Sequence, residues 1–220
     1  MEPVRRRDVV AVTDAADTAP AARGGFPEVR PVEDAPPELG RFVAAMRRLQ
    51  DLTVSTNPSS SLWADAAAHL ESACALFDGH QVPETEVVAG RVLSIPGLGH
   101  PLMPPWTLTD SGRDGVTMTG HFTEAHVGGN RAVHGGMIPL LYDWLLGMVV
   151  TAAGIRPTRT AFLHVDYRKI TPINEPLEAR GTITEIDGRK VFITATMTAA
   201  DGAVLSEANG LMVRLLPHQP

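Results

Sequence analysis

The segment 135–153 constrains the fold of this chain more than any other. Its apolar residues recur at helical spacing and also occupy the remaining faces of the helix: Ile138, Leu140, Leu141, Trp144, Leu145, Leu146, Met148, Val149 and Val150. A helix that is apolar on nearly all sides is buried, whereas a surface helix carries one apolar stripe. Gly154, with Pro157 soon after it, predicts the end of this helix. The rest of the chain must therefore supply a layer that covers it.

Strand-like segments flank this helix on both sides. Residues 106–109 and 116–122 precede it and enclose a turn-rich stretch, and the segments 158–170, 177–199 and 203–216 follow it. Asp–Gly pairs at 187–188 and 201–202 are typical of hairpin turns. These signals predict an α+β fold in which an antiparallel sheet wraps around one long central helix.

The first half of the chain has a different character. Residues 1–37 are rich in Ala, Pro, Asp and Arg without a sustained period, which predicts a flexible tail. Residues 38–80 predict an N-terminal extension of two helices, the second opening at a cap-and-proline sequence, 57–59. A Pro/Gly-rich connecting loop, 81–105, leads to the main domain at 106–216. We expect the extension to pack on that domain.

Composition argues against several classes of function. The net charge of −6 leaves no broad basic field for nucleic acid. The longest apolar stretch is too short to span a bilayer, so we expect no membrane segment and a cytoplasmic location. The single cysteine, Cys74, lies in an apolar run and is expected to be a buried structural thiol. Three histidines lack the ligand spacing of a metal site, so no metal is predicted: His121, His126 and His164.

Asp143 is the most informative polar residue. It lies in the middle of the apolar helix, where an ionised carboxylate without a partner is costly. One interpretation is a structural carboxylate that pairs with a basic group or with backbone. The other is a nucleophile or general base that a dry site keeps reactive.

The sequence His134, Gly135, Gly136 precedes the same helix. Glycines at a strand-to-helix junction allow close backbone approach, and the N–H groups of a helix start suit an oxygen that gains negative charge. A plain structural turn is the alternative interpretation. His134 itself is either a catalytic helper or an anchor of the turn, and we favour the anchor.

Helix geometry separates these two groups. Gly135 and Gly136 precede Asp143 by eight and seven residues, so a rise of about 1.5 Å per residue places them roughly 10–12 Å away. A single carbonyl must have its oxygen near the N–H donors and its carbon near the carboxylate. If both groups serve one substrate, they therefore come from two copies of the chain, and the site lies across a homodimer interface.

The spacing of these residues resembles that of a known family. The His-Gly-Gly sequence at 134–136, Asp143 nine residues after the histidine and Gly147 four residues later resemble the hotdog-fold acyl-CoA thioesterases. The similarity is to the phenylacetyl-CoA thioesterase-like group and its thioesterase-superfamily-member branch. Residues 160–167, 187–192 and 205–208 are also similar to that branch. The resemblance covers about residues 106–216.

This resemblance implies a hotdog fold, dimers that often pair into tetramers, and hydrolysis of acyl-CoA thioesters. Because water is the second substrate of such a hydrolysis, we expect no metal or redox cofactor. By position, Asp143 corresponds to the nucleophile or general base, and Gly135 to the backbone oxyanion donor. Thr160 corresponds to a residue that orients the water or the carboxylate, although an ordinary strand threonine also fits there. Pro139 departs from the pattern but falls in the first turns of the helix, where proline is tolerated.

Coenzyme A would also require groups that bind its phosphates. The candidates are polar or basic residues on either side of the helix: Asn130, Arg131, Arg168 and Lys169. Asn130 does not stand at the family's usual Asn position. Two other functions stay open: a non-catalytic acyl-CoA-binding or regulatory hotdog module, and a hotdog dehydratase. The His-before-Asp order and the Gly-Gly turn fit a dehydratase poorly.

Overall fold

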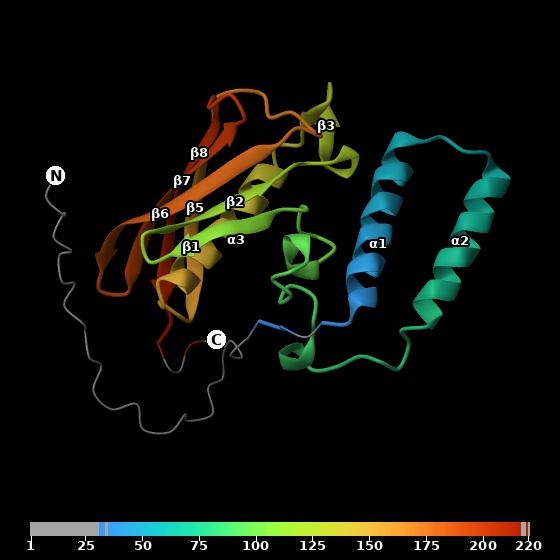
Figure 1. Ribbon diagram of the computed structural model, residues 1–220, viewed down its shortest axis with the longest axis horizontal. Helices are drawn as coiled ribbons and strands as arrows, with labels where there is room; N and C mark the ends of the chain where they lie inside the picture. Colours follow the sequence, from blue (N-terminus) through green and yellow to red (C-terminus); the bar gives the residue numbers. More distant parts are fainter. Residues whose placement is uncertain (1–30, 34, 217–218, 220) are drawn as a thin grey trace, which may run out of the picture.

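A computed structural model describes residues 31–33, 35–216 and 219, and its main feature is an antiparallel sheet packed on one helix (Figure 1). The six strands lie in the order β1-β2-β6-β7-β8-β5. Their bounds are β1 Thr107–Gly112, β2 Gly115–Gly120, β5 Thr158–Tyr167, β6 Leu177–Asp187, β7 Lys190–Ala199 and β8 Val204–Arg214. The predicted α+β class and hotdog architecture are confirmed.

The central helix α3, Met137–Ala152, lies against one face of this sheet (Figure 1). One side of it is fully buried: Ile138, Leu141, Tyr142, Leu145, Leu146, Val149 and Val150. The helix ends at Ala152, and the chain leaves it through Gly154, whose φ of +74° suits glycine. The opposite side is open in the single chain, where Asp143 is exposed and Trp144 is half-buried. The expectation of burial on all sides is therefore wrong for this face, because one sheet covers only one side of a helix.

Two glycines allow α3 to approach the sheet closely. A Cβ at Gly181 of β6 would lie 2.9 Å from Val149 Cγ2 and 3.2 Å from Leu145 Cγ. A Cβ at Gly210 of β8 would overlap Leu146 Cδ2. Because core packing leaves little room for an added methyl group, the distance between helix and sheet depends on these two positions.

The strands after the helix do not all lie beside their neighbours in sequence. Gly188 and Gly202, with φ of +58° and +82°, form the predicted hairpin turns. However, β5 pairs with β8 and lies at the edge of the sheet, so it does not join β6, the next strand in sequence. Before the helix, the turn between β1 and β2 is shorter than the predicted 110–115 stretch.

A small second sheet was not predicted. It consists of β3, Val127–Gly129, and β4, Ala132–Val133, and it follows the short helix η3, Glu124–His126. The two residues between the strands, Asn130 and Arg131, both have positive φ, of 50° and 58°. Such a pair of left-handed residues is the conformation of a tight hairpin turn.

The N-terminal extension forms two helices, α1 Pro37–Ser55 and α2 Ser60–Ala75. The helix α2 starts next to the predicted 57–59 sequence, but its cap is Ser59, after the proline: the Ser59 side chain accepts the N–H of Leu62 at 3.3 Å. Figure 1 shows α1 beside the main domain and α2 on its outer side. The expected packing holds for α1, which buries Val43, but α2 buries no residue. Cys74 is consequently exposed on α2, so its predicted burial is wrong.

The connecting segment and the tail complete the described chain. The 81–105 loop contains the short helices η1, Glu84–Glu86, and η2, Pro96–Gly99. Most of the predicted tail, 1–37, lies outside the described residues, and Pro37 already belongs to α1. No helix in the part of the chain that the structure describes is long and apolar enough to cross a membrane.

The close contact at Gly210 can be tested by adding one methyl group. We expect Gly210→Ala to lower the free energy of unfolding by about 1–3 kcal/mol, because the new Cβ must displace Leu146. Gly112→Ala is the control, since a Cβ there meets open space, and it should change stability by less than about 0.5 kcal/mol. Urea unfolding measures both. Equal midpoints for the two variants would show that Leu146 moves aside without cost.

Candidate active site

A hydrogen bond joins the two predicted catalytic residues of the helix and the sheet. The Thr160 hydroxyl on β5 donates to Asp143 Oδ1 at 2.7 Å, and its oxygen lies 3.3 Å from Met212 Sδ. Asp143 is exposed in the single chain, so the dry site expected for it is not formed by one chain alone. The bond gives this carboxylate a defined orientation on the open side of α3.

A bulge in β5 points Thr160 toward the helix. Thr160 pairs with Met212, but the register shifts by one residue before Phe162 pairs with Leu211 and Leu163 pairs with Gly210. Gly210 faces α3, because its Cβ would meet Leu146. The extra residue therefore allows both Thr160 and Leu163 to face the helix despite the odd spacing between them. Strand alternation alone would have placed them on opposite faces.

One of the two glycine N–H groups in the turn before α3 forms a hydrogen bond within the turn. The N–H of Gly136 donates to His134 Nδ1 at 3.0 Å, and the His134 carbonyl accepts the N–H of Met137 at 2.9 Å. His134 thus holds the turn, as the anchor interpretation expects. The N–H of Gly135 has no acceptor among the described residues. Gly135 is therefore the better placed of the two predicted oxyanion donors.

Tyr167, at the end of β5, also supports this turn. Its hydroxyl donates to the carbonyl oxygen of Gly135 at 2.8 Å. The residue was not assigned a role from the sequence, since nothing in the sequence pairs position 167 with position 135. The turn is therefore held from one side by His134 and from the other by Tyr167.

A pocket of about 440 Å³ opens beside this turn. Its lining combines apolar residues with three of the predicted site residues: Ala132, Val133, Gly135, Ile138, Tyr167, Arg168, Lys169, Ile170 and Thr171. The structure thus brings Gly135, Arg168 and Lys169 together. Asn130 and Arg131 do not line it, and Arg131 instead lies 3.7 Å from the Glu124 carboxylate.

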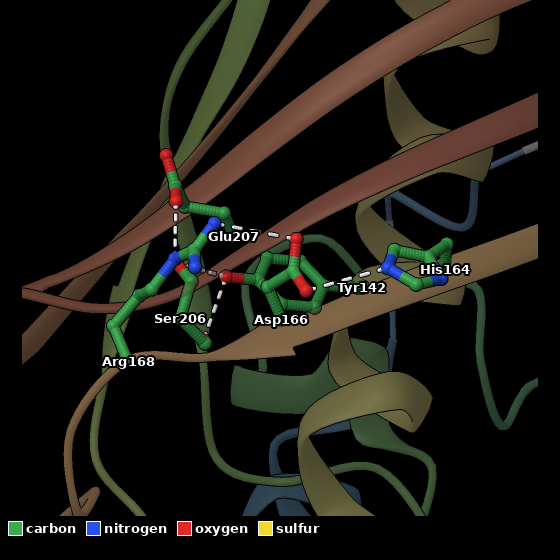
Figure 2. Close-up of polar contacts among 6 residues, drawn as sticks. All are labelled: Tyr142, His164, Asp166, Arg168, Ser206 and Glu207. Carbon is green, nitrogen blue, oxygen red and sulfur yellow. Dashed lines mark hydrogen bonds and ion pairs between the residues drawn. The ribbon is translucent and has the colours of Figure 1, made fainter.

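Arg168 is engaged by acidic neighbours on the sheet. Its Nε donates to Glu207 Oε2 at 2.7 Å and its Nη2 lies 3.3 Å from Asp166 Oδ2 (Figure 2). The hydrogen bond to Glu207 and the charge of Asp166 raise the pKa of Arg168. Of the two predicted phosphate-binding cations in the pocket, Lys169 is therefore the one more available to an anionic ligand.

The residue before Asp143 fixes the helix to the sheet. Tyr142 is fully buried, and its hydroxyl lies 2.8 Å from Ser206 Oγ and donates to the Ser206 carbonyl at 2.9 Å (Figure 2). Burial raises the pKa of Tyr142 to about 12. Because successive helix residues point in directions about 100° apart, anchoring Tyr142 inward helps to place Asp143 on the open face.

The three histidines considered for a metal site lie on different elements of the fold. His121 follows β2, His126 ends η3 and His164 lies on β5. Over residues 31–33, 35–216 and 219, no group of three His, Cys, Asp or Glu side chains is arranged to hold a metal ion.

Three comparisons relate the chain to known proteins. Residues 130–206 match the family model of the thioesterase superfamily. The chain is 34% identical over 89 residues to the rat protein named acyl-coenzyme A thioesterase THEM4, and 32% identical over 89 residues to the mouse protein of that name. Each match covers 40% of this chain and 38% of the relative, so it spans well under half of those proteins.

A solved structure matches over a larger part of the chain. The crystal structure of a thioesterase superfamily protein has a TM-score of 0.71 and 28% sequence identity, covering 84% of this chain and 98% of that one. The predicted main domain, residues 106–216, makes up half of the 220 residues, whereas the match covers 84% of them. The similarity therefore includes part of the N-terminal extension.

The support of the turn by Tyr167 predicts a local effect of Tyr167→Phe. Losing a hydrogen bond worth about 1 kcal/mol should speed amide exchange at Gly136 about fivefold, because the turn opens more often. Exchange measured by NMR checks this. Tyr142→Phe is the matched control, since it removes a tyrosine hydroxyl that bonds to Ser206, away from the turn. Unchanged exchange in Tyr167→Phe would mean that His134 alone holds the turn.

Proposed function

We propose that the chain hydrolyses acyl-CoA thioesters to a free acid and coenzyme A, because residues 130–206 match the family model of the thioesterase superfamily and the domain around them has the hotdog fold. The observation that carries the proposal is the Asp143 carboxylate, which Thr160 orients at 2.7 Å on an otherwise apolar helix. On the exposed side of α3 this carboxylate can ionise and meet a substrate, as a nucleophile or general base must.

The reaction adds water to the thioester carbonyl and breaks the C–S bond. As the carbonyl carbon becomes tetrahedral, its oxygen gains negative charge, which the N–H of Gly135 stabilises. Asp143 either attacks the carbon itself or removes a proton from the attacking water, and Thr160 holds the carboxylate in place for both routes. The thiol of coenzyme A leaves with a proton, so the reaction requires no metal or redox cofactor.

In this proposal the Asp143 carboxylate and the Gly135 N–H that act on one substrate belong to different copies of the chain. Gly136 is the N-cap of α3 and the helix runs unbroken to Asp143, so the two lie about 10 Å apart along the helix axis. One carbonyl cannot contact both within one chain. A partner whose turn approaches the open face of α3 would complete the site and exclude water from Asp143.

The edge of the sheet supports such a homodimer. In the described chain, β5 pairs with β8 alone, so its second edge is unpaired, and Phe162 on it is 47% exposed. An exposed edge strand with a large apolar residue is a surface that another copy can cover. Pairing of dimers into tetramers and a cytoplasmic location remain predictions.

Lys169 is proposed to bind a phosphate of coenzyme A. It is exposed and lines the pocket that contains Gly135, whereas the guanidinium of Arg168 is held by Glu207. In this arrangement the ligand reaches the Gly135 N–H past the residues at the C-terminal end of β5. The apolar residues of the pocket would contact the uncharged part of the ligand.

Replacing the carboxylate tests the reaction. We expect Asp143→Asn to lower kcat at least about 100-fold while the fold is retained, because an amide neither attacks the carbonyl nor accepts a proton. Release of free thiol is measured across short, medium, long and aromatic acyl-CoAs. Asp187→Asn, in an exposed hairpin turn, is the control. Wild-type turnover in Asp143→Asn would refute the mechanism, and a wild-type chain that binds acyl-CoA without releasing thiol would favour the binding module.

Mixed dimers test the sharing of the site. Gly135→Pro removes the proposed donor, and Gly135→Ala is its control, since a Cβ there would lie 3.7 Å from the Tyr167 hydroxyl and fits. A dimer of one Asp143→Asn chain and one Gly135→Pro chain should keep one working site of two, because the intact groups meet across the interface. An inactive mixed dimer would instead place both groups of each site in one chain.

A further inference from the structure

The helix α1 contacts the catalytic domain through a charged hydrogen bond. Asp51, near its C-terminal end, accepts the N–H of Ala125 at 3.0 Å through its Oδ1 atom, and the bond is partly buried. The two residues are 74 positions apart in sequence. In Figure 1, α1 lies on the side of the domain that carries η3 and β3. This bond is therefore a direct link between the extension and the segment before the turn.

A second residue fixes the position of Asp51. Arg47, one helical turn earlier, donates through Nη2 to the Pro96 carbonyl at 2.7 Å and reaches the His100 carbonyl at 3.3 Å. A Cβ at Gly97 would lie 2.6 Å from the same nitrogen, so glycine leaves the space for it. With Arg47 and the buried Val43 holding the helix, the Asp51 carboxylate has little freedom to move away from Ala125.

The segment that Asp51 contacts is itself hydrogen-bonded to the turn. Ala125 lies in the three-residue helix η3, whose last residue, His126, accepts the N–H of His134 through its carbonyl at 2.7 Å. Gly128 packs against the same backbone, since a Cβ there would lie 2.7 Å from His134 Cα. The backbone of His134 is thus positioned by the segment that Asp51 holds.

His134 in turn determines the direction of the proposed donor. The Gly135 N–H belongs to the peptide that joins His134 to Gly135, so its direction follows the backbone of His134. A donor must lie within about 3 Å of the oxyanion and point at it, and small displacements weaken it strongly. A displacement of Asp51 would therefore reach Gly135 through two hydrogen bonds, Asp51 to Ala125 and His126 to His134.

We propose that Asp51 is a positioning residue of this site: by holding Ala125 and η3, it places His134 so that the Gly135 N–H points at the substrate carbonyl. This inference rests on the proposed thioesterase function. It gives the N-terminal helix a part in the reaction, although Asp51 contacts no reacting atom. Its effect should appear in kcat, because the oxyanion forms only in the transition state.

Three variants test this role. Asp51→Ala removes the acceptor and should lower kcat about tenfold while KM changes less than about twofold. Asp51→Asn keeps a carbonyl oxygen that can accept the Ala125 N–H and should restore most of the activity. Asp65→Ala, at an exposed aspartate on α2, is the matched control and should behave as the wild-type chain.

Hydrogen–deuterium exchange supplies a readout that does not depend on catalysis. We expect faster exchange over residues 124–136 in Asp51→Ala than in Asp65→Ala, with the thermal midpoint and helix content measured alongside. Wild-type kcat and wild-type exchange in Asp51→Ala would overturn the proposal, as would a loss confined to KM. A wild-type chain that releases no thiol would refute the proposed function, whereas the exchange comparison would still test the link between Asp51 and the turn.

Discussion

The close packing of α3 on the sheet is the contact on which the rest of the structure depends. Gly181 and Gly210 remove two side chains where Leu145, Leu146 and Val149 press against the strands. The helix can therefore bury a full apolar side and still leave its opposite side uncovered. Since the sheet covers only one side of the helix, the carboxylate of Asp143 faces away from the core and is exposed.

This packing places the two chemical groups at different positions along one rigid element. The turn lies at the N-terminus of α3, where His134 and Tyr167 hold it, and Asp143 lies two turns further along, where Thr160 orients it. A rigid helix keeps these groups about 10 Å apart, so the proposed reaction needs a second chain. Asp143 is exposed in a single chain because the sheet covers only the opposite side of the helix.

The two helices of the N-terminal extension differ in their contacts with the main domain. Arg47 and Asp51 bind α1 to backbone groups of the connecting loop and of η3. The helix α2 buries no residue and lies on the outer side of α1 (Figure 1). Because the solved structure matches 84% of the chain, part of the extension has a counterpart in that structure. Its inner helix is the part that contacts the segment before the turn.

The sequence by itself determined the elements whose signals are local. An apolar run predicted α3, Asp–Gly pairs predicted two hairpins, and the carboxylate of Asp143 within that run marked it as a candidate catalytic residue. Only the tertiary structure decided which groups meet across the fold. It placed β5 beside β8, bonded Gly136 to His134, brought Tyr167 to Gly135 and Asp51 to Ala125, and left Asp143 exposed. Those outcomes depend on strand order, a bulge and helix docking, which join residues far apart in sequence and leave no periodic pattern in it.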